Sequence, residues 1–243
     1  MEYQVYLFDF DYTLADSSRG IVMCYRRVLD RHGYTSPTDD DIKRTIGKTL
    51  EESFALMTGV TDADRLAEFK RQYVKEADAC MTANTVLFPE VEGVLRRLKA
   101  GGARLGIIST KYRYRIRELL VDRGLDDVFD LVVGGEDVKT AKPSPEGVLM
   151  ALNRLQAGKE EVLYVGDSVV DAETGKLDLP GLGGNGDVVH HPVVQRAVRL
   201  EFQRAQRVRD ALQCVLNRVC EIVHRIDAPL VALTVMVHVA DAV

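Results

Sequence analysis

Three features are missing from this chain of 243 residues: a long hydrophobic run, an N-terminal signal pattern and an excess of basic residues. Its most apolar stretch, residues 229–239, falls well short of the roughly 20 residues that span a bilayer. The N-terminus has no basic segment followed by a long apolar one, and it leads directly into acidic residues. We therefore expect neither membrane insertion nor a signal peptide, and we predict a cytoplasmic location.

Cysteine is also sparse. Cys24, Cys80, Cys214 and Cys220 form no CxxC pair and lack the density of a disulfide scaffold, which favours a reducing compartment. The formal net charge of -5 argues against a broad basic surface for nucleic acid or anionic lipid. A local cationic pocket could still bind a phosphate group, so the expected partner is a small anionic molecule.

Short strand-like runs alternate with helical patterns through much of the chain. Apolar, β-branched runs that are typical of buried strands cover residues 4–10, 104–109, 128–134 and 161–165. Helical patterns cover residues 90–100, 116–123 and 145–155. This alternation predicts an α/β fold, in which a doubly wound, Rossmann-like parallel sheet is covered by helices on both faces.

A block of helical patterns separates the first strand-like run from the others. It is interrupted at Gly33, Pro37 and Gly59, residues that commonly end helices. We therefore predict an all-helical cap at residues 17–83, inserted into a core formed by residues 1–16 and 84–176.

Candidate catalytic residues gather at the predicted carboxyl ends of the strands, where open α/β sheets bind their ligands. They are Asp9 and Asp11 after the first strand, Ser109 after the second, Lys142 in a loop before a helix, and Asp167 and Asp171 after the last. Each residue alone also has a purely structural interpretation. Ser109 and Asp167 could be helix caps, and Lys142 a solvated loop residue. Their joint occurrence at one edge of the sheet favours a catalytic site.

Four segments resemble the motifs of the haloacid dehalogenase superfamily. DFDYTLADS is similar to the first motif, IIST to the second, KPSP to the third and GDSVVD to the fourth. The resemblance covers residues 1 to about 176. Phosphoglycolate-phosphatase-like members are the most similar by pattern, and their helical cap also follows the first motif.

The resemblance implies a Mg²⁺-dependent phosphatase that hydrolyses a small, phosphoglycolate-like phosphate monoester through an aspartyl-phosphate. It assigns the nucleophile to Asp9, acid/base catalysis to Asp11, a hydrogen bond to the phosphoryl group to Ser109, and charge neutralisation to Lys142. The implied metal ligands are Asp9, the backbone carbonyl of Asp11, Asp167 and Asp171. A small phosphorylated metabolite is the implied partner, with a homodimer as one option.

Further residues are candidates for contact with the substrate. Thr110 and Lys111 follow the second motif, where family members often have Asn-Lys. Lys48 lies at a predicted helix start in the cap, where backbone N–H groups could hold an anion. Arg19 follows the first motif. The arginines within residues 113–117 are expected to form a solvated helix face.

The sequence departs from the family in two places. Tyr12 occupies a position that is Gly in most members. No lysine occurs after Lys176, and residues 177–243 lack the family's last strands, although 193–226 have an amphipathic helical pattern. We hypothesise that this segment arose by frameshift or replacement. Translation of the coding DNA in the other reading frames tests the idea, which fails if no frame yields a family-like ending.

Two alternatives remain open at this point. A phosphomutase of the β-phosphoglucomutase type shares the same four motifs and passes the phosphoryl group to a sugar. A catalytically impaired binding protein would result if the altered C-terminal segment leaves the core sheet incomplete.

Overall fold

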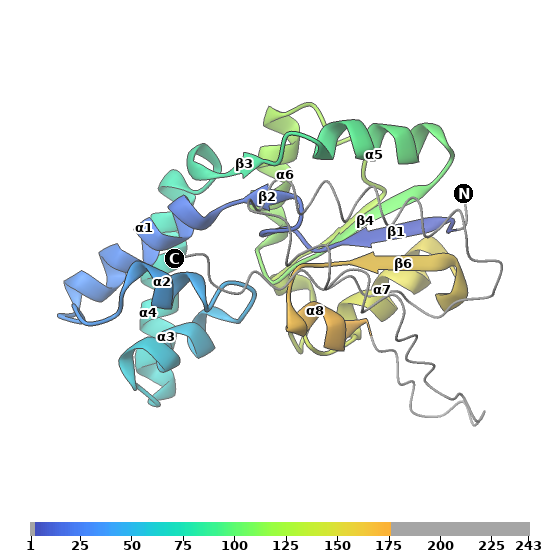
Figure 1. Cartoon of the computed structure of the whole chain (residues 1–243). Coiled ribbons are helices and arrows are strands. Elements are labelled where there is room, and N and C mark those ends of the chain that lie inside the picture. The colour runs from blue at the N-terminus through green and yellow to red at the C-terminus, as the bar shows by residue number, and fades with distance from the viewer. Residues whose placement is uncertain (1–2, 176–243) are drawn as a thin grey trace, which may run out of the picture.

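A single parallel sheet forms the centre of the molecule (Figure 1). The computed structural model describes residues 3–175, so the predictions for residues 177–243 lie outside the described residues. The strands are β1 (Val5–Phe8), β4 (Arg104–Ile108), β5 (Leu131–Val133) and β6 (Val162–Val165). They lie in the order β5-β4-β1-β6 with every pair parallel, which confirms the predicted α/β sheet.

Helices pack on both faces of this sheet. They are α5 (Val91–Ala100), α6 (Arg113–Asp122), α7 (Glu146–Leu155) and α8 (Val169–Thr174). Because successive side chains of a strand point to opposite faces, Tyr6 and Phe8 join the apolar cluster that includes residues of α5 and α6. Val5 and Leu7 join the cluster that includes residues of α7. This alternation explains why β1 is buried along its whole length.

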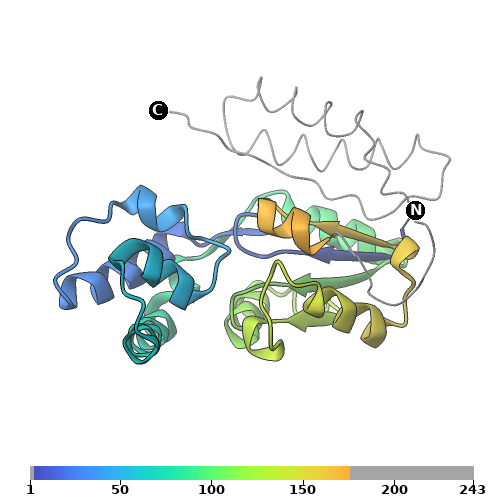
Figure 2. The same ribbon diagram turned by 90° about the horizontal axis from the view of Figure 1, so that it is seen from below.

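The first four helices of the chain form the cap. They are α1 (Ser18–Arg31), α2 (Asp39–Lys43), α3 (Leu50–Thr58) and α4 (Ala63–Cys80). The cap has its own apolar cluster, in which the Phe54 ring packs at a tilt against the rings of Tyr25 and Phe69, with centroid distances of 4.8 and 5.2 Å. In Figure 2 the cap helices lie on one side of the molecule and the sheet with its helices on the other.

A short antiparallel ribbon joins the cap to the core, and the sequence patterns did not predict it. Its strands are β2 (Ala15–Asp16) and β3 (Val86–Leu87). The chain reaches β2 through a tight turn in which Tyr12 has a φ of 63°. A positive φ favours glycine, so the glycine expected here from the family resemblance would adopt this conformation more readily than Tyr12 does. Three single-turn 3₁₀ helices complete the described elements: η1 (Thr82–Asn84), η2 (Gly135–Asp137) and η3 (Lys159–Glu161).

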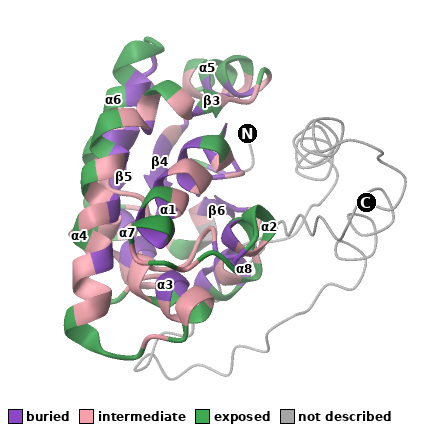
Figure 3. Cartoon of the chain, turned by 90° about the vertical axis from the view of Figure 1, so that its left-hand side faces the viewer, coloured by how far each residue is buried: buried purple, intermediate pink, exposed green. Residues whose placement is uncertain are grey.

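Helices α6 of the core and α4 of the cap lie along the same side of the molecule (Figure 3). Arg115 of α6 is only 5% exposed, and its guanidinium contacts Asp78 Oδ1 at 2.7 Å and the Val74 carbonyl at 2.9 Å. The prediction that the arginines of this helix form a solvated face is therefore wrong for Arg115, because α4 covers it. Arg113 and Arg117 remain partly exposed in ion pairs within the core.

Within residues 3–175, no helix combines the length and apolar character needed to cross a membrane.

Candidate active site

Asp9 lies directly after β1, in the middle of the sheet. Its backbone N–H donates to the Val165 carbonyl at 2.9 Å, which extends the pairing of β1 with β6 to Asp9. The side chain is buried, and its Oδ1 lies 2.8 Å from Lys142 Nζ. The ammonium group of Lys142 therefore neutralises part of the charge of this carboxylate.

Asp171 occupies the base of the site. Its carboxylate is completely buried and accepts hydrogen bonds from Lys142 Nζ at 2.6 Å, Tyr164 Oη at 3.0 Å and the Ser168 N–H at 3.1 Å. Gly166 allows this close approach, because a Cβ at that position would lie 2.4 Å from the Asp171 side chain. The fourth motif therefore needs glycine before its first aspartate in order to admit the second.

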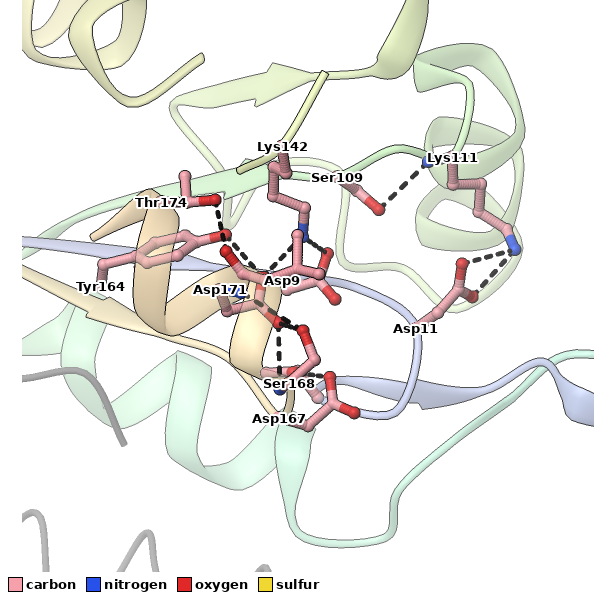
Figure 4. A network of polar contacts seen from close by, with 12 residues as sticks. Asp9, Asp11, Ser109, Lys111, Lys142, Tyr164, Asp167, Ser168, Asp171 and Thr174 are labelled. Atoms are coloured by element: carbon pink, nitrogen blue, oxygen red, sulfur yellow. Dashed lines mark hydrogen bonds and ion pairs between the residues drawn. The ribbon is translucent and has the colours of Figure 1, made fainter. Parts of the chain in front are cut away.

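Carboxylates from two different strand ends converge at this point, as Figure 4 shows. Asp9, Asp167 and Asp171 each offer an oxygen, and these atoms all lie within 4.8 Å of one another. Burial raises the pKa of Asp9 to about 6, despite the opposing effect of Lys142. Burial, together with the charges of Asp9 and Asp171, raises the pKa of Asp167 to about 8. A divalent cation would relieve this repulsion, so the donor set fits a Mg²⁺ ion.

Lys142 supplies the positive charge of the site. It precedes α7, is joined to Pro143 by a cis peptide bond, and has a side chain that is 5% exposed. Burial acts to lower its pKa, but the charges of Asp9 and Asp171 raise the pKa well above the ordinary lysine value. Lys142 in turn lowers the pKa of Asp171, although burial opposes that effect. The lysine is therefore protonated and Asp171 is ionised at neutral pH.

Asp11 and Ser109 lie at the same edge of the sheet but outside the three-carboxylate cluster. The Asp11 carboxylate points toward Lys111 and away from Asp9 (Figure 4), with Lys111 Nζ at 2.9 Å from Oδ1 and 3.2 Å from Oδ2. Ser109 is buried, and its hydroxyl oxygen accepts a hydrogen bond from the Lys111 N–H at 3.3 Å. The structure therefore pairs Asp11 with Lys111, which lie 100 positions apart and which the sequence analysis did not pair.

A family model matches the greater part of the chain. The model for haloacid dehalogenase-like hydrolases matches residues 6–177. The chain belongs to this family. The match ends near the point where the sequence pattern changes, and the resemblance seen in the four motifs is confirmed.

Two curated proteins and one solved structure are similar to this chain over most of its length. Pyrophosphatase PpaX of Listeria monocytogenes is 37% identical over 175 residues, covering 70% of this chain and 77% of that protein. Phosphoglycolate phosphatase of Aquifex aeolicus is 32% identical over 177 residues, covering 71% of this chain and 80% of that protein. A crystal structure of a haloacid dehalogenase-like hydrolase from Bacteroides fragilis is 64% identical with a TM-score of 0.70, covering 71% of this chain and 82% of that one.

The remaining substrate-binding predictions fall in less enclosed places of this hydrolase fold. Thr110 is half-buried in the loop after β4. Lys48 pairs with Glu52 of α3 at 2.8 Å, and Thr49 caps that helix through the Glu52 N–H. Arg19 is exposed in the first turn of α1. Substrate binding by Thr110, Lys48 and Arg19 therefore stays a prediction.

Sequence reasoning missed several polar side chains that hold the site together. Tyr164 donates to Asp171, Thr13 Oγ1 donates to Asp167 Oδ1 at 3.2 Å, and the Ser168 hydroxyl bonds to Asp171. Tyr164 offered a signal, because a tyrosine inside a buried strand usually needs a partner for its hydroxyl. Thr13 and Ser168 lie within motifs but resemble ordinary turn and cap residues.

Proposed function

We propose that this protein is a Mg²⁺-dependent phosphatase that hydrolyses a small phosphate monoester through an aspartyl-phosphate on Asp9. One observation carries the proposal: three carboxylates converge within 4.8 Å at the end of the sheet, and a buried lysine contacts two of them. Such a site can bring a dianionic phosphate and an anionic nucleophile together, which neither water nor an uncharged pocket would do.

The metal would be held by Asp9, Asp167 and Asp171, with the backbone carbonyl of Asp11 as a further ligand. Mg²⁺ favours a few carboxylate oxygens and retains several waters, and when bound it would neutralise negative charge on the carboxylates and the phosphoryl oxygens. The raised pKa values of Asp9 and Asp167 support this assignment, because burial and the neighbouring carboxylates disfavour their negative charges, and a bound cation would offset this.

Asp9 is positioned as the nucleophile at the end of β1, where its backbone N–H bonds to the last residue of β6. One of its carboxylate oxygens forms a bond to phosphorus while the bond from phosphorus to the leaving oxygen breaks. Lys142 neutralises the nucleophile and the transferring group, and the Ser109 hydroxyl donates to a phosphoryl oxygen. Dividing one displacement into two lowers each barrier.

Asp11 would transfer the proton in both steps. It gives a proton to the leaving oxygen, and afterwards takes one from the water that attacks the aspartyl-phosphate and releases inorganic phosphate. A well-placed group of this kind contributes about 10² to 10⁴ in rate.

The substrate is proposed from the relatives. A phosphoglycolate-like monoester is our first candidate, because phosphoglycolate phosphatase of Aquifex aeolicus is 32% identical. Inorganic pyrophosphate is a second candidate, favoured by the 37% identity with pyrophosphatase PpaX. Either substrate carries a negative charge on the group that leaves.

The direct test measures inorganic phosphate released from para-nitrophenyl phosphate, 2-phosphoglycolate and pyrophosphate, with and without Mg²⁺, for the wild type and Asp9→Asn. We expect release that requires Mg²⁺ and disappears in the variant. Release that persists in a folded Asp9→Asn protein would contradict the assigned nucleophile. Phosphate transfer to a sugar phosphate with little release would favour a phosphomutase instead.

A further inference from the structure

Lys111 lies where the catalytic edge of the core meets the two chain segments that lead to the cap. The first of these segments, which we call linker 1, contains Ser17 between β2 and α1. The second, linker 2, contains Thr85 between η1 and β3. Lys111 Nζ donates to both oxygens of Asp11 and also to Ser17 Oγ at 3.3 Å. Its side chain is 7% exposed.

A chain of hydroxyl groups continues from Lys111 into linker 2. Ser17 Oγ and Thr85 Oγ1 lie 3.2 Å apart, and Thr85 Oγ1 lies 2.9 Å from the Met81 carbonyl. A hydroxyl has one hydrogen to donate, and a carbonyl can only accept. Lys111 donates to Ser17, and the Thr85 hydroxyl lies within donor distance of both Ser17 Oγ and the Met81 carbonyl, so its single hydrogen serves one of them at a time. The contacts therefore form an unbroken chain from the ammonium group to the end of the cap.

We propose that Lys111 is a positioning residue that ties the Asp11 carboxylate to both linkers of the cap. This inference rests on the proposed function, in which Asp11 handles the proton of the leaving group. Lys111 contacts both oxygens of the carboxylate, which fixes its orientation. When Asp11 carries the proton for the leaving group, that proton occupies one oxygen and Lys111 keeps its bond to the other. Lys111 itself is held by Ser17, so a movement of either linker is transmitted to the acid/base group.

Burial gives this arrangement its strength. Asp11, Ser17 and Thr85 are each at most 9% exposed, so water cannot easily replace the contacts between them. Hydrogen bonds to charged groups in such surroundings are among the stronger ones. The ring of Phe10, with its centroid 5.7 Å from Lys111 Nζ, further limits where the ammonium can move.

Two other roles for Lys111 lead to different kinetics. A lysine that contacts the substrate would affect every phosphate ester with the same charge, and a purely structural lysine would affect all substrates through folding. A residue that positions the acid should matter most when the leaving oxygen needs a proton. Para-nitrophenolate leaves readily without one, whereas an alkoxide does not.

The experiment therefore compares kcat/KM for para-nitrophenyl phosphate and for an alkyl ester, β-glycerophosphate, in Mg²⁺. The value of kcat/KM covers the steps up to departure of the leaving group, so it isolates the proton donation. For Lys111→Met we expect a loss with the alkyl ester that exceeds the loss with the aryl ester by at least about tenfold, a part of the effect of a general acid. Equal losses for both esters would overturn the proposal.

A matched pair at Thr85 tests the connection to the cap and remains informative if Lys111→Met fails to fold. Thr85→Val removes the hydroxyl at nearly constant shape, while Thr85→Ser keeps it. We expect Thr85→Val to show the same selective loss, smaller in size, and Thr85→Ser to retain the wild-type ratio of the two kcat/KM values. Equal ratios for the two variants would contradict the coupling. A wild type that is inactive on both esters would instead overturn the proposed function and the inference with it.

Discussion

The catalytic edge of the core and the interior of the cap are built from opposite kinds of side chain. At the core edge, Asp9, Asp171 and Lys142 are ionisable and buried. The cap interior is apolar and aromatic, and charged groups of the cap such as Lys48 and Glu52 form partly exposed pairs at its surface. Buried charges cost free energy unless they are paired, and exposed pairs contribute little. The catalytic edge therefore gives up stability to arrange charge, whereas the cap interior is stabilised by packing.

Removal of the buried lysine should have the largest effect on stability and activity. Lys142→Met would leave two buried carboxylates without their cation. We expect a loss of about 3–5 kcal/mol in the free energy of unfolding without Mg²⁺, and at least a roughly 10²-fold loss of phosphatase activity. Urea unfolding and phosphate release measure the two effects. Lys48→Met is the control, for which we expect a change within about 0.5 kcal/mol; equal losses in the two variants would refute the contrast.

The next largest effect should be on the affinity of the site for Mg²⁺. Asp167→Asn removes one of the three converging carboxylates, so we expect Mg²⁺ to bind at least about tenfold more weakly, since even indirect partners of a metal cost about 10–100-fold. Titration calorimetry with Mg²⁺ measures this. Asp126→Asn, at a partly exposed ion pair of the core, should bind Mg²⁺ as the wild type does. Unchanged affinity in Asp167→Asn would place the metal elsewhere.

The contact between core and cap should show an intermediate effect. Arg115→Met removes a buried guanidinium that bonds to Asp78 and to the Val74 carbonyl. We expect a stability loss of about 1–3 kcal/mol, typical of a broken charged hydrogen bond. Arg117→Met on the same helix removes a partly exposed pair and should change stability by less than about 1 kcal/mol. Chemical unfolding of both variants measures these losses in the free energy of unfolding. A larger loss for Arg117→Met would be inconsistent with the packing of α6 against α4.

The pH dependence of the metal-free protein tests the same electrostatics without any substitution. Burial raises the folded pKa of Asp9 to about 6 and that of Asp167 to about 8, above the ordinary value of 3.8. A carboxyl group with a raised pKa binds its proton more tightly in the folded state, so its stabilising contribution is lost as the pH rises. We expect the melting temperature in EDTA to fall between about pH 4 and pH 8. Asp171, with a lowered pKa, contributes stability that is lost only at more acidic pH.

Two variants of the same measurement check the cause. Asp167→Asn should flatten the decline, because it removes the group with the highest raised carboxyl pKa in the site. Added Mg²⁺ should reverse the decline, because the metal binds the deprotonated carboxylates. A melting temperature that rises across this range without metal would contradict the electrostatic account.

The sequence predicted the core edge well because its signals are local. Asp9 and Asp167 each follow an apolar run, and a parallel sheet brings such strand ends together whatever the length of chain between them. Residues outside this rule were harder to predict. The strands β2 and β3 are too short to show a periodic pattern, and Arg115 looked solvated because nothing in its own helix reveals that α4 covers it. The pairing of Asp11 with Lys111 depends on a tertiary contact across 100 residues.

The central claim is that Asp9 carries the phosphoryl group, and trapping that group tests it most directly. The wild type would be mixed with ³²P-labelled phosphate ester and Mg²⁺, quenched in acid within one turnover, digested and mapped. We predict label on the peptide that contains Asp9, released by hydroxylamine as an acyl phosphate should be, and no label in Asp9→Asn. Label at another residue, or steady turnover of the wild type with no labelled protein at any quench time, would contradict the account.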